Sequence, residues 1–159
     1  LDLHEGDAAQ LLVSPASAGA ALCIGATEAL GGFRSCIQTL AGWLRPGGFA
    51  LVGEGFWRKD PGPEFLTALG ATRDDYLDHA GNVAAGAAAG LIPHYAAVSS
   101  DDEWDRYEWL HCRNIELYAA ANPDDPDVPA LLQRRRAWRD LYLRHGRGTL
   151  GLGLYLFRK

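Results

Sequence analysis

One stretch decides the fold, residues 22–54, which read LCIGATEALGGFRSCIQTLAGWLRPGGFALVGE. Its first strand ends at Ile24, and apolar residues at helical spacing follow from Phe33 to Leu44. Pro46 ends that helix, and paired glycines turn the chain into a second apolar strand, Phe49 to Gly53. A strand, a helix and a second strand in this order predict one βαβ unit with parallel strands.

Both predicted strands end in residues suited to ligand binding. Residues Ala20 to Ile24 show no polar alternation, which is typical of a strand buried on both faces. This strand ends in Gly25-Ala26, where small side chains let a ligand approach the backbone, and Glu28 follows. The second strand ends on Glu54. Because ligands of parallel sheets bind outside the carboxyl ends of the strands, both carboxylates are expected at the binding edge.

The remaining chain continues this pattern without a repeat, a low-complexity tract or a linker, so a single domain is predicted over residues 1–159. A capping box, Ser100 with Glu103, predicts the start of a long helix that ends at Asn122. The other predicted elements are helices at Glu64–Leu69, Thr72–Ala89 and Pro129–His145, and strands at Leu91–Val98 and Leu150–Phe157.

Composition excludes several classes of protein. A net charge of −5 argues against a nucleic-acid-binding surface, which needs a basic excess. The basic run Arg134-Arg135-Arg136 is interpreted as a solvated helix face that pairs with nearby acidic residues. No signal peptide or membrane-length apolar run is present. The three cysteines share no disulfide spacing, so we expect a reducing, cytoplasmic location. His111-Cys112 are adjacent and lack a second ligand pair, so no metal site is predicted.

The beginning of the chain suggests a truncated protein, because it starts at Leu1 and contains no methionine. Residues Leu1 to Glu5 alternate apolar and polar like the last residues of a strand. Asp7 follows, so it is a candidate acceptor for a ligand amine or hydroxyl group. The alternative is that Asp7 caps a short helix over Ala8 to Leu12.

The first strand, the helix and the Leu44-Arg45-Pro46-Gly47-Gly48 turn together resemble the fourth and fifth strands of class I S-adenosylmethionine-dependent methyltransferases. Gly6-Asp7-Ala8 resembles the segment after the third strand of that family. The resemblance implies an α/β, Rossmann-like sheet, mostly parallel with an antiparallel last strand, lacking its first strands, and with helices on both faces. The glycine-rich loop after the first strand of the family has no match here. Gly146 to Gly153 follows a helix, which is the wrong order for such a loop.

The resemblance also implies the cofactor, S-adenosyl-L-methionine. The residues expected to bind it are Asp7, Ala8, Cys23, Ile24, Gly25 and Ala26. In the family, an acidic side chain in the segment of Asp7 meets the adenine amine. The implied activity is methyl transfer to a small molecule, with this chain a truncated form expected to bind the cofactor weakly or not at all; the oligomeric state is left open.

Methyl transfer requires a nucleophile held in line with the methyl group, and a general base where that nucleophile carries a proton. Glu54 is the first candidate base and His94 the second. Each has a structural alternative: Glu54 as a carboxylate that binds loop amides, and His94 as a hydrogen-bonded histidine in the core or at its rim. The candidate substrate-binding residues are Glu28, Trp57, Trp104, Tyr107 and Arg147, although the aromatic stripe from Trp104 to Tyr118 is also typical of core packing.

Two other functions compete with this one. The chain could be a non-catalytic α/β ligand-binding or interaction domain that has lost its cofactor loop. A nicotinamide-dependent reductase would need a tyrosine and a lysine about four residues apart on one helix. The only lysines are Lys59 and Lys159, so the reductase is disfavoured.

Overall fold

A computed structural model describes residues 3–159, which form two compact units. The first comprises the chain up to Trp57 together with Asp74–Val98 and Leu152–Lys159, and the second comprises Arg58–Arg73 and Ser99–Gly151. The single-domain organisation stays a prediction.

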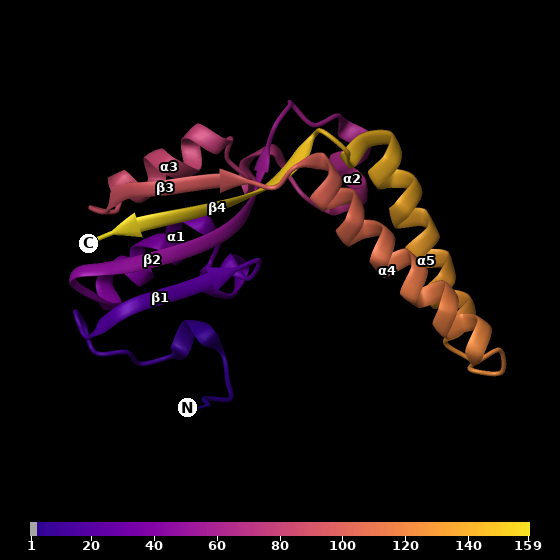
Figure 1. Cartoon of the computed structure of the whole chain (residues 1–159), viewed down its shortest axis with the longest axis horizontal. Coiled ribbons are helices and arrows are strands. Elements are labelled where there is room, and N and C mark those ends of the chain that lie inside the picture. Colours follow the sequence, from indigo (N-terminus) through magenta and orange to yellow (C-terminus); the bar gives the residue numbers. More distant parts are fainter. Residues whose placement is uncertain (1–2) are drawn as a thin grey trace. The chain divides into compact units, whose positions relative to one another are not determined.

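The first unit is built on a four-stranded mixed sheet (Figure 1). The strands are β1 (Ala18–Ile24), β2 (Leu44–Trp57), β3 (Ile92–Val98) and β4 (Leu150–Arg158), in the order β1-β2-β4-β3. β1 and β2 are parallel, whereas β3 and β4 are antiparallel. The Lys159 amide donates to the Gly48 carbonyl (2.9 Å), so β4 ends where β2 begins and the two strands run in opposite directions. The predicted α/β sheet with an antiparallel last strand is confirmed.

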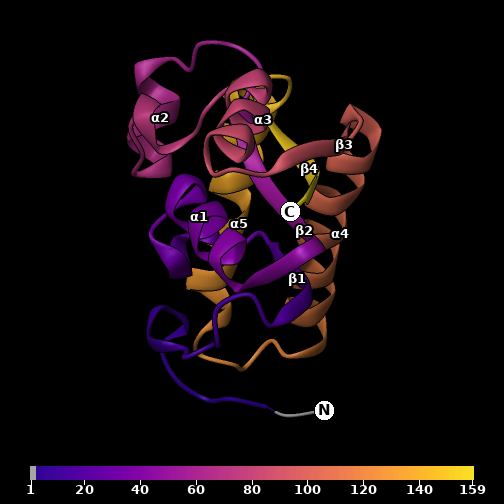
Figure 2. The same ribbon diagram turned by 90° about the vertical axis from the view of Figure 1, so that its left-hand side faces the viewer.

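Helices α1 (Phe33–Trp43) and α3 (His79–Ala88) pack on the same face of this sheet (Figure 2). The predicted apolar stripe of α1 is buried because Phe33, Ile37 and Leu40 recur at helical spacing toward the strands. The rest of this core comes from Ala50, Val52, Tyr155 and Phe157 on β2 and β4 and from Ala85 on α3. On β1, Cys23 packs toward this core, while Leu22 and Ile24 are exposed on the opposite face.

Two sequence predictions in this unit are wrong. Leu3–Glu5 do not form the end of a strand, because no strand of the described sheet lies beside them to share backbone hydrogen bonds; Leu1 and Asp2 lie outside the described residues. The helix predicted over Thr72–Ala89 is split into a 3-10 turn, η3 (Arg73–Asp75), and α3. Asp78 causes the break, since its side chain accepts from the Gly81 amide (2.6 Å) and starts a new helix.

The Leu44–Gly48 segment is not a free turn but the beginning of β2. Gly48 has no room for a side chain, because a Cβ there would lie 2.9 Å from the Arg45 carbonyl oxygen and 3.1 Å from that of Gly19. The register of β1 against β2 also shifts between Ala18 and Ala20. The glycine therefore allows the two backbones to approach where the parallel pairing starts.

The second unit contains α2 (Pro63–Leu69), α4 (Asp101–Ala121), α5 (Val128–Leu141) and a π-helical turn, η4 (Tyr142–Gly146). α4 and α5 lie side by side (Figure 1), and the predicted capping box of Ser100 and Glu103 starts α4. The basic run does pair, but with α4: Arg135 bonds the buried Glu108, and Arg136 bonds Glu116 through two 2.7 Å contacts. Helix packing brings these distant residues together, which sequence proximity could not show.

Among residues 3–159, no helix is both long and apolar enough to cross a membrane.

Gly86 on α3 tests the packing of the first unit. A Cβ at Gly86 would lie 2.0 Å from the Phe157 ring, so Gly86→Ala should lower the free energy of unfolding by at least about 1–3 kcal/mol. Gly42→Ala on α1 is the matched control: a Cβ there meets nothing within 4 Å, so stability should rise by about 0.5–1 kcal/mol. Denaturant unfolding measures both, and equal stability of the two variants would contradict the packing.

Asp105 provides a pH test of the second unit. The Tyr142 hydroxyl donates to its carboxylate (2.5 Å), and Arg147 contacts it at 3.0 Å. The pKa of Asp105 is lowered, chiefly by the Tyr142 hydrogen bond and further by Arg147. Because the pKa is lower in the folded state, the stabilisation is present above the unfolded-state pKa and is lost as pH falls through the folded-state pKa.

We therefore expect Tyr142→Phe to raise the pKa of Asp105 toward its ordinary value, measured by NMR titration of the carboxyl carbon. Tyr118→Phe removes the corresponding hydrogen bond to Asp125 (2.6 Å) and should leave Asp105 unchanged. An Asp105 pKa that is the same in wild type and Tyr142→Phe would refute the role of this hydrogen bond.

Candidate functional site

The carboxyl end of β1 lies beside Gly53 of β2, and β2 continues to Trp57, beyond the strand end predicted at Gly53. The Gly25 amide, just after β1, donates to the Gly53 carbonyl of β2 (2.9 Å). After β1 the chain forms a 3-10 turn, η2 (Thr27–Leu30), and then enters α1 through Gly31 and Gly32, both with positive φ. Glu54 follows Gly53 directly, so its carboxylate lies beside this turn.

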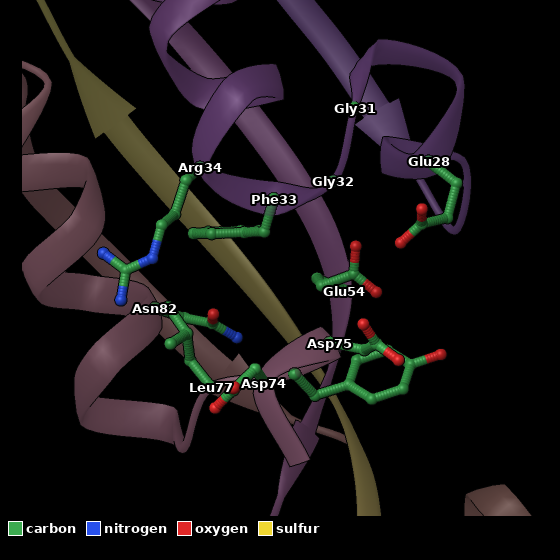
Figure 3. Close-up of a pocket in the computed structure, with 11 residues that line it drawn as sticks. Glu28, Gly31, Gly32, Phe33, Arg34, Glu54, Asp74, Asp75, Leu77 and Asn82 are labelled. Atoms are coloured by element: carbon green, nitrogen blue, oxygen red, sulfur yellow. The ribbon is translucent and has the colours of Figure 1, made fainter. Parts of the chain in front are cut away.

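A pocket of about 200 Å³ lies at this edge, within the first unit (Figure 3). Its lining comes from the segment after β1, the first residues of α1, the last part of β2, the η3 region and α3. The lining residues are Glu28, Gly31, Gly32, Phe33, Arg34, Glu54, Asp74, Asp75, Tyr76, Leu77 and Asn82. Two predicted site residues, Glu28 and Glu54, are therefore brought together in one pocket.

Glu54 is held by two donors. The buried Thr27 hydroxyl donates to Oε2, and the Gly55 amide donates to Oε1 (2.6 Å). The Gly55 contact is a backbone-amide bond, as the structural alternative for Glu54 expects, although this amide belongs to β2 and not to a loop. A carboxylate has about four lone-pair positions, so both oxygens keep the capacity to accept from a ligand.

Asn82 is completely buried beneath the pocket. Its Nδ2 lies 3.0 Å from the Tyr155 hydroxyl and 3.4 Å from the Gly55 carbonyl, and the Tyr155 hydroxyl lies 3.1 Å from His79 Nδ1. The Gly55 carbonyl accepts only, which assigns the NH₂ group to that side of the amide. Within the described part of the chain, Asn82 Oδ1 has no hydrogen-bond partner.

The pocket is electrostatically negative. Burial raises the pKa of Tyr76, and the charges of Glu54, Glu28 and Asp75 raise it further, so its hydroxyl stays protonated. Burial also raises the pKa of Tyr155, and Glu54 contributes to that rise against the opposing hydrogen bond from Asn82. The Cys36 thiol of α1 has its pKa raised to about 12 by burial and then by Cys23 and Glu54. All three groups respond to the carboxylate of Glu54.

The residues expected to bind the cofactor lie near the same edge. Gly25 and Ala26 are exposed just after β1, and Gly25 has φ +64° with open space where a Cβ would lie. The 3-10 turn η1 (Ala8–Gln10) lies against η2, and a hollow of about 540 Å³ beside it includes Asp7 and Ala8. The Asp7 side chain accepts from the Ala9 amide (2.9 Å), so the capping alternative for Asp7 is observed.

Cys23 and Ile24 differ in their exposure. Cys23 packs toward the core, whereas Ile24 is exposed on the opposite face of β1. The backbone at the carboxyl end of β1 is therefore the part of this segment that a ligand could contact.

The other predicted site residues are not gathered at the pocket. The His94 ring packs on Phe49 near the start of β2, with centroids 5.4 Å apart. Glu54 lies five residues further along the strand, about 16 Å away at 3.3 Å per residue. Trp57 stacks edge-on against Tyr76 (5.1 Å) and so supports the pocket wall. Trp104, Tyr107 and Arg147 belong to the second unit and stay predictions.

Of the lining residues, sequence reasoning proposed only Glu28 and Glu54 as site residues; those it missed include Asp74, Asp75, Tyr76 and Asn82. The acidic-aromatic run 74–76 before the Asp78 cap was a usable signal, because it breaks a helical pattern with polar residues. Asn82 gave no signal, since a single asparagine within a helix is ordinary. Among residues 3–159, no group of three or more His, Cys, Asp or Glu side chains is placed to hold a metal ion.

Known proteins share this architecture. A methyltransferase dependent on S-adenosylmethionine from Geobacter sulfurreducens, solved with S-adenosyl-L-homocysteine, is 31% identical with a TM-score of 0.84. The corresponding enzyme from Thiobacillus denitrificans, also solved with S-adenosyl-L-homocysteine, is 31% identical with a TM-score of 0.83. Each match covers 97% of this chain. The chain has a class I methyltransferase fold.

This methyltransferase fold is present only in part. The chain spans 62% of each of those two structures. It is also 31% identical, over 85% of its length, to the uncharacterized protein YjhP of Escherichia coli (strain K12), of which it spans 55%. No protein-family profile matches the chain.

The negative field of the pocket can be tested through Tyr76. Glu54→Gln removes a negative charge that disfavours the phenolate, so the pKa of Tyr76 should fall toward its ordinary value. Glu64→Gln makes the same change at an exposed carboxylate of α2 and should leave Tyr76 unchanged. NMR titration of the tyrosine Cζ signals measures both, and a Tyr76 pKa unaffected by Glu54→Gln would show that the two groups do not interact.

Proposed function

We propose that this chain is part of an S-adenosylmethionine-dependent methyltransferase that acts on a small molecule. The observation that carries the proposal is the pocket where β1 ends beside Glu54 of β2. The chain around this pocket is 31% identical in sequence to two methyltransferases solved with S-adenosyl-L-homocysteine. A pocket of about 200 Å³ suits a small substrate or one end of a larger one. The free cysteines Cys23, Cys36 and Cys112 support a reducing, cytoplasmic setting.

The cofactor would lie along the segment from β1 to η2 and the neighbouring η1 turn. S-adenosylmethionine, when bound, supplies a methyl group made electrophilic by its sulfonium. The open space at Gly25 and the exposed Ala26 fit close approach of a ligand to the backbone. Asp7 keeps lone pairs beyond its cap bond and can accept a hydrogen bond from an adenine amine, with Ala8 beside it.

Glu54 is the group best placed to hold or remove a proton of the substrate. Thr27 and Gly55 fix its orientation, and it shares the pocket with Glu28. A base positioned in this way contributes about 10²- to 10⁴-fold to the rate where the nucleophile carries a proton. His94 is not included in this proposal, because it lies toward the opposite end of β2.

We further propose that the native protein is longer than this chain. The chain spans 62% of its structural relatives, and its sequence has no match to the glycine-rich loop that follows the first strand of the family. Leu22 (67% exposed) and Ile24 (53% exposed) on the face opposite α1 are consistent with additional structure covering that face. Sequencing the DNA upstream of the Leu1 codon tests this: a frame encoding a strand and a glycine-rich turn supports it, and a stop codon favours the interaction-domain alternative.

Calorimetry with S-adenosyl-L-homocysteine tests the cofactor proposal. The longest product of the reading frame should bind it, and this chain alone should bind it more weakly. Asp7→Asn should weaken binding by about 10- to 100-fold, the loss expected for a hydrogen bond to a charged group. Asp102→Asn, at an exposed site of α4, is the control and should bind as wild type does. Absence of binding by the longest product would refute the methyltransferase proposal.

A further inference from the structure

We infer that the pocket at the ends of β1 and β2 recognises a protonated amine, so that the substrate is an amine held through its ammonium group. The inference rests on the proposed function only for what happens to the amine afterwards. Recognition itself depends on residues of the first unit alone.

The charges of the lining favour a cation. Four carboxylates, those of Glu28, Glu54, Asp74 and Asp75, line the pocket against a single guanidinium, that of Arg34. Figure 3 shows the Arg34 guanidinium pointing away from Glu54 and Glu28. A carboxylate or phosphate ligand would meet the same carboxylates and be repelled.

The buried amide of Asn82 provides an independent indication. Its side chain is fully buried and lies against the space bordered by Phe33, Glu54 and Leu77 (Figure 3). Because its Nδ2 is used by Tyr155 and Gly55, the remaining atom, Oδ1, is an acceptor without a donor in the described residues. A buried acceptor without a partner is costly, so a ligand that brings N–H donors gains by satisfying it.

An ammonium group matches both features. It offers three donors and no acceptor, while the pocket offers the fixed Glu54 carboxylate, the Oδ1 of Asn82 and the carboxylate of Glu28. A neutral hydroxyl would satisfy one acceptor only and leave the negative field uncompensated. Burial raises the pKa of both Tyr76 and Tyr155, and the charge of Glu54 contributes to each rise.

The experiment uses three probes of similar size: n-butylammonium, 1-butanol and butyrate. Each is titrated into the chain at neutral pH while the side-chain NH₂ signals of Asn82 are followed by NMR. Butylammonium should bind at least about 10-fold more tightly than 1-butanol, the factor that 1.4 kcal/mol of charge recognition gives, and butyrate should not bind. Equal binding of the amine and the alcohol would overturn the inference.

Variants locate the binding. Glu54→Gln should weaken butylammonium binding by about 10-fold or more while leaving 1-butanol unchanged. Glu64→Gln, the same change on α2, should have no effect. Because the comparison of amine with alcohol is made on the wild type, the inference stays testable if Glu54→Gln does not fold. Loss of butylammonium binding in Glu64→Gln to the same degree would also refute this site.

A final arm separates this inference from the proposed function. S-adenosyl-L-homocysteine carries an amino group of its own, so the butylammonium titration is repeated with it present on the longest product of the reading frame. Simultaneous binding supports a separate amine substrate, whereas competition between the two would assign the pocket to the cofactor and overturn the inference. Binding of butylammonium without any binding of S-adenosyl-L-homocysteine would refute the proposed methyltransferase function but would still support the ammonium site.

Discussion

The parallel pairing of β1 with β2 is the constraint on which the rest of the first unit depends. The bond from the Gly25 amide to the Gly53 carbonyl fixes the end of β1 beside Glu54 of β2. Parallel strands need a crossover connection, and α1 provides it while burying one face of both strands. As a result, two segments separated by a whole helix place Glu28 and Glu54 in one pocket.

A second arrangement supports that pocket from below. Asn82 of α3 and Tyr155 of β4 are both fully buried polar side chains, and they are linked by a 3.0 Å hydrogen bond. The Tyr155 hydroxyl also lies within hydrogen-bond distance of His79 Nδ1 (3.1 Å). A small polar network therefore joins α3 and β4 inside an otherwise apolar core. Such networks are costly unless satisfied, which makes the Oδ1 of Asn82 informative, since it has no hydrogen-bond partner among residues 3–159.

The candidate functions require different side chains at the sheet edge where β1 ends beside Glu54. A non-catalytic interaction domain has no need for a carboxylate oriented by a buried hydroxyl and a backbone amide, as Glu54 is. A nucleic-acid-binding protein would place basic side chains where this pocket places acidic ones. The similarity to two methyltransferases, at 31% sequence identity, agrees with a ligand-binding pocket in this position, although the chain spans only 62% of those structures.

The sequence by itself determined the βαβ unit and the start of α4. These follow from local patterns: apolar runs, the stripe from Phe33 to Leu40, and the capping box at Ser100. Glu54 was also a candidate from the sequence, because it follows an apolar run, although β2 continues past it to Trp57.

Only the tertiary structure decided which side chains share a pocket. Asp75 and Asn82 come from segments far from Glu54 in sequence. No local sequence pattern predicts which helix packs beside which strand end. The same reason separates His94 from Glu54, since a residue early in β3 lies toward the opposite end of the sheet from the end of β2. Local sequence sets each element through short-range backbone and side-chain preferences, whereas long-range packing alone sets the neighbours of each strand end.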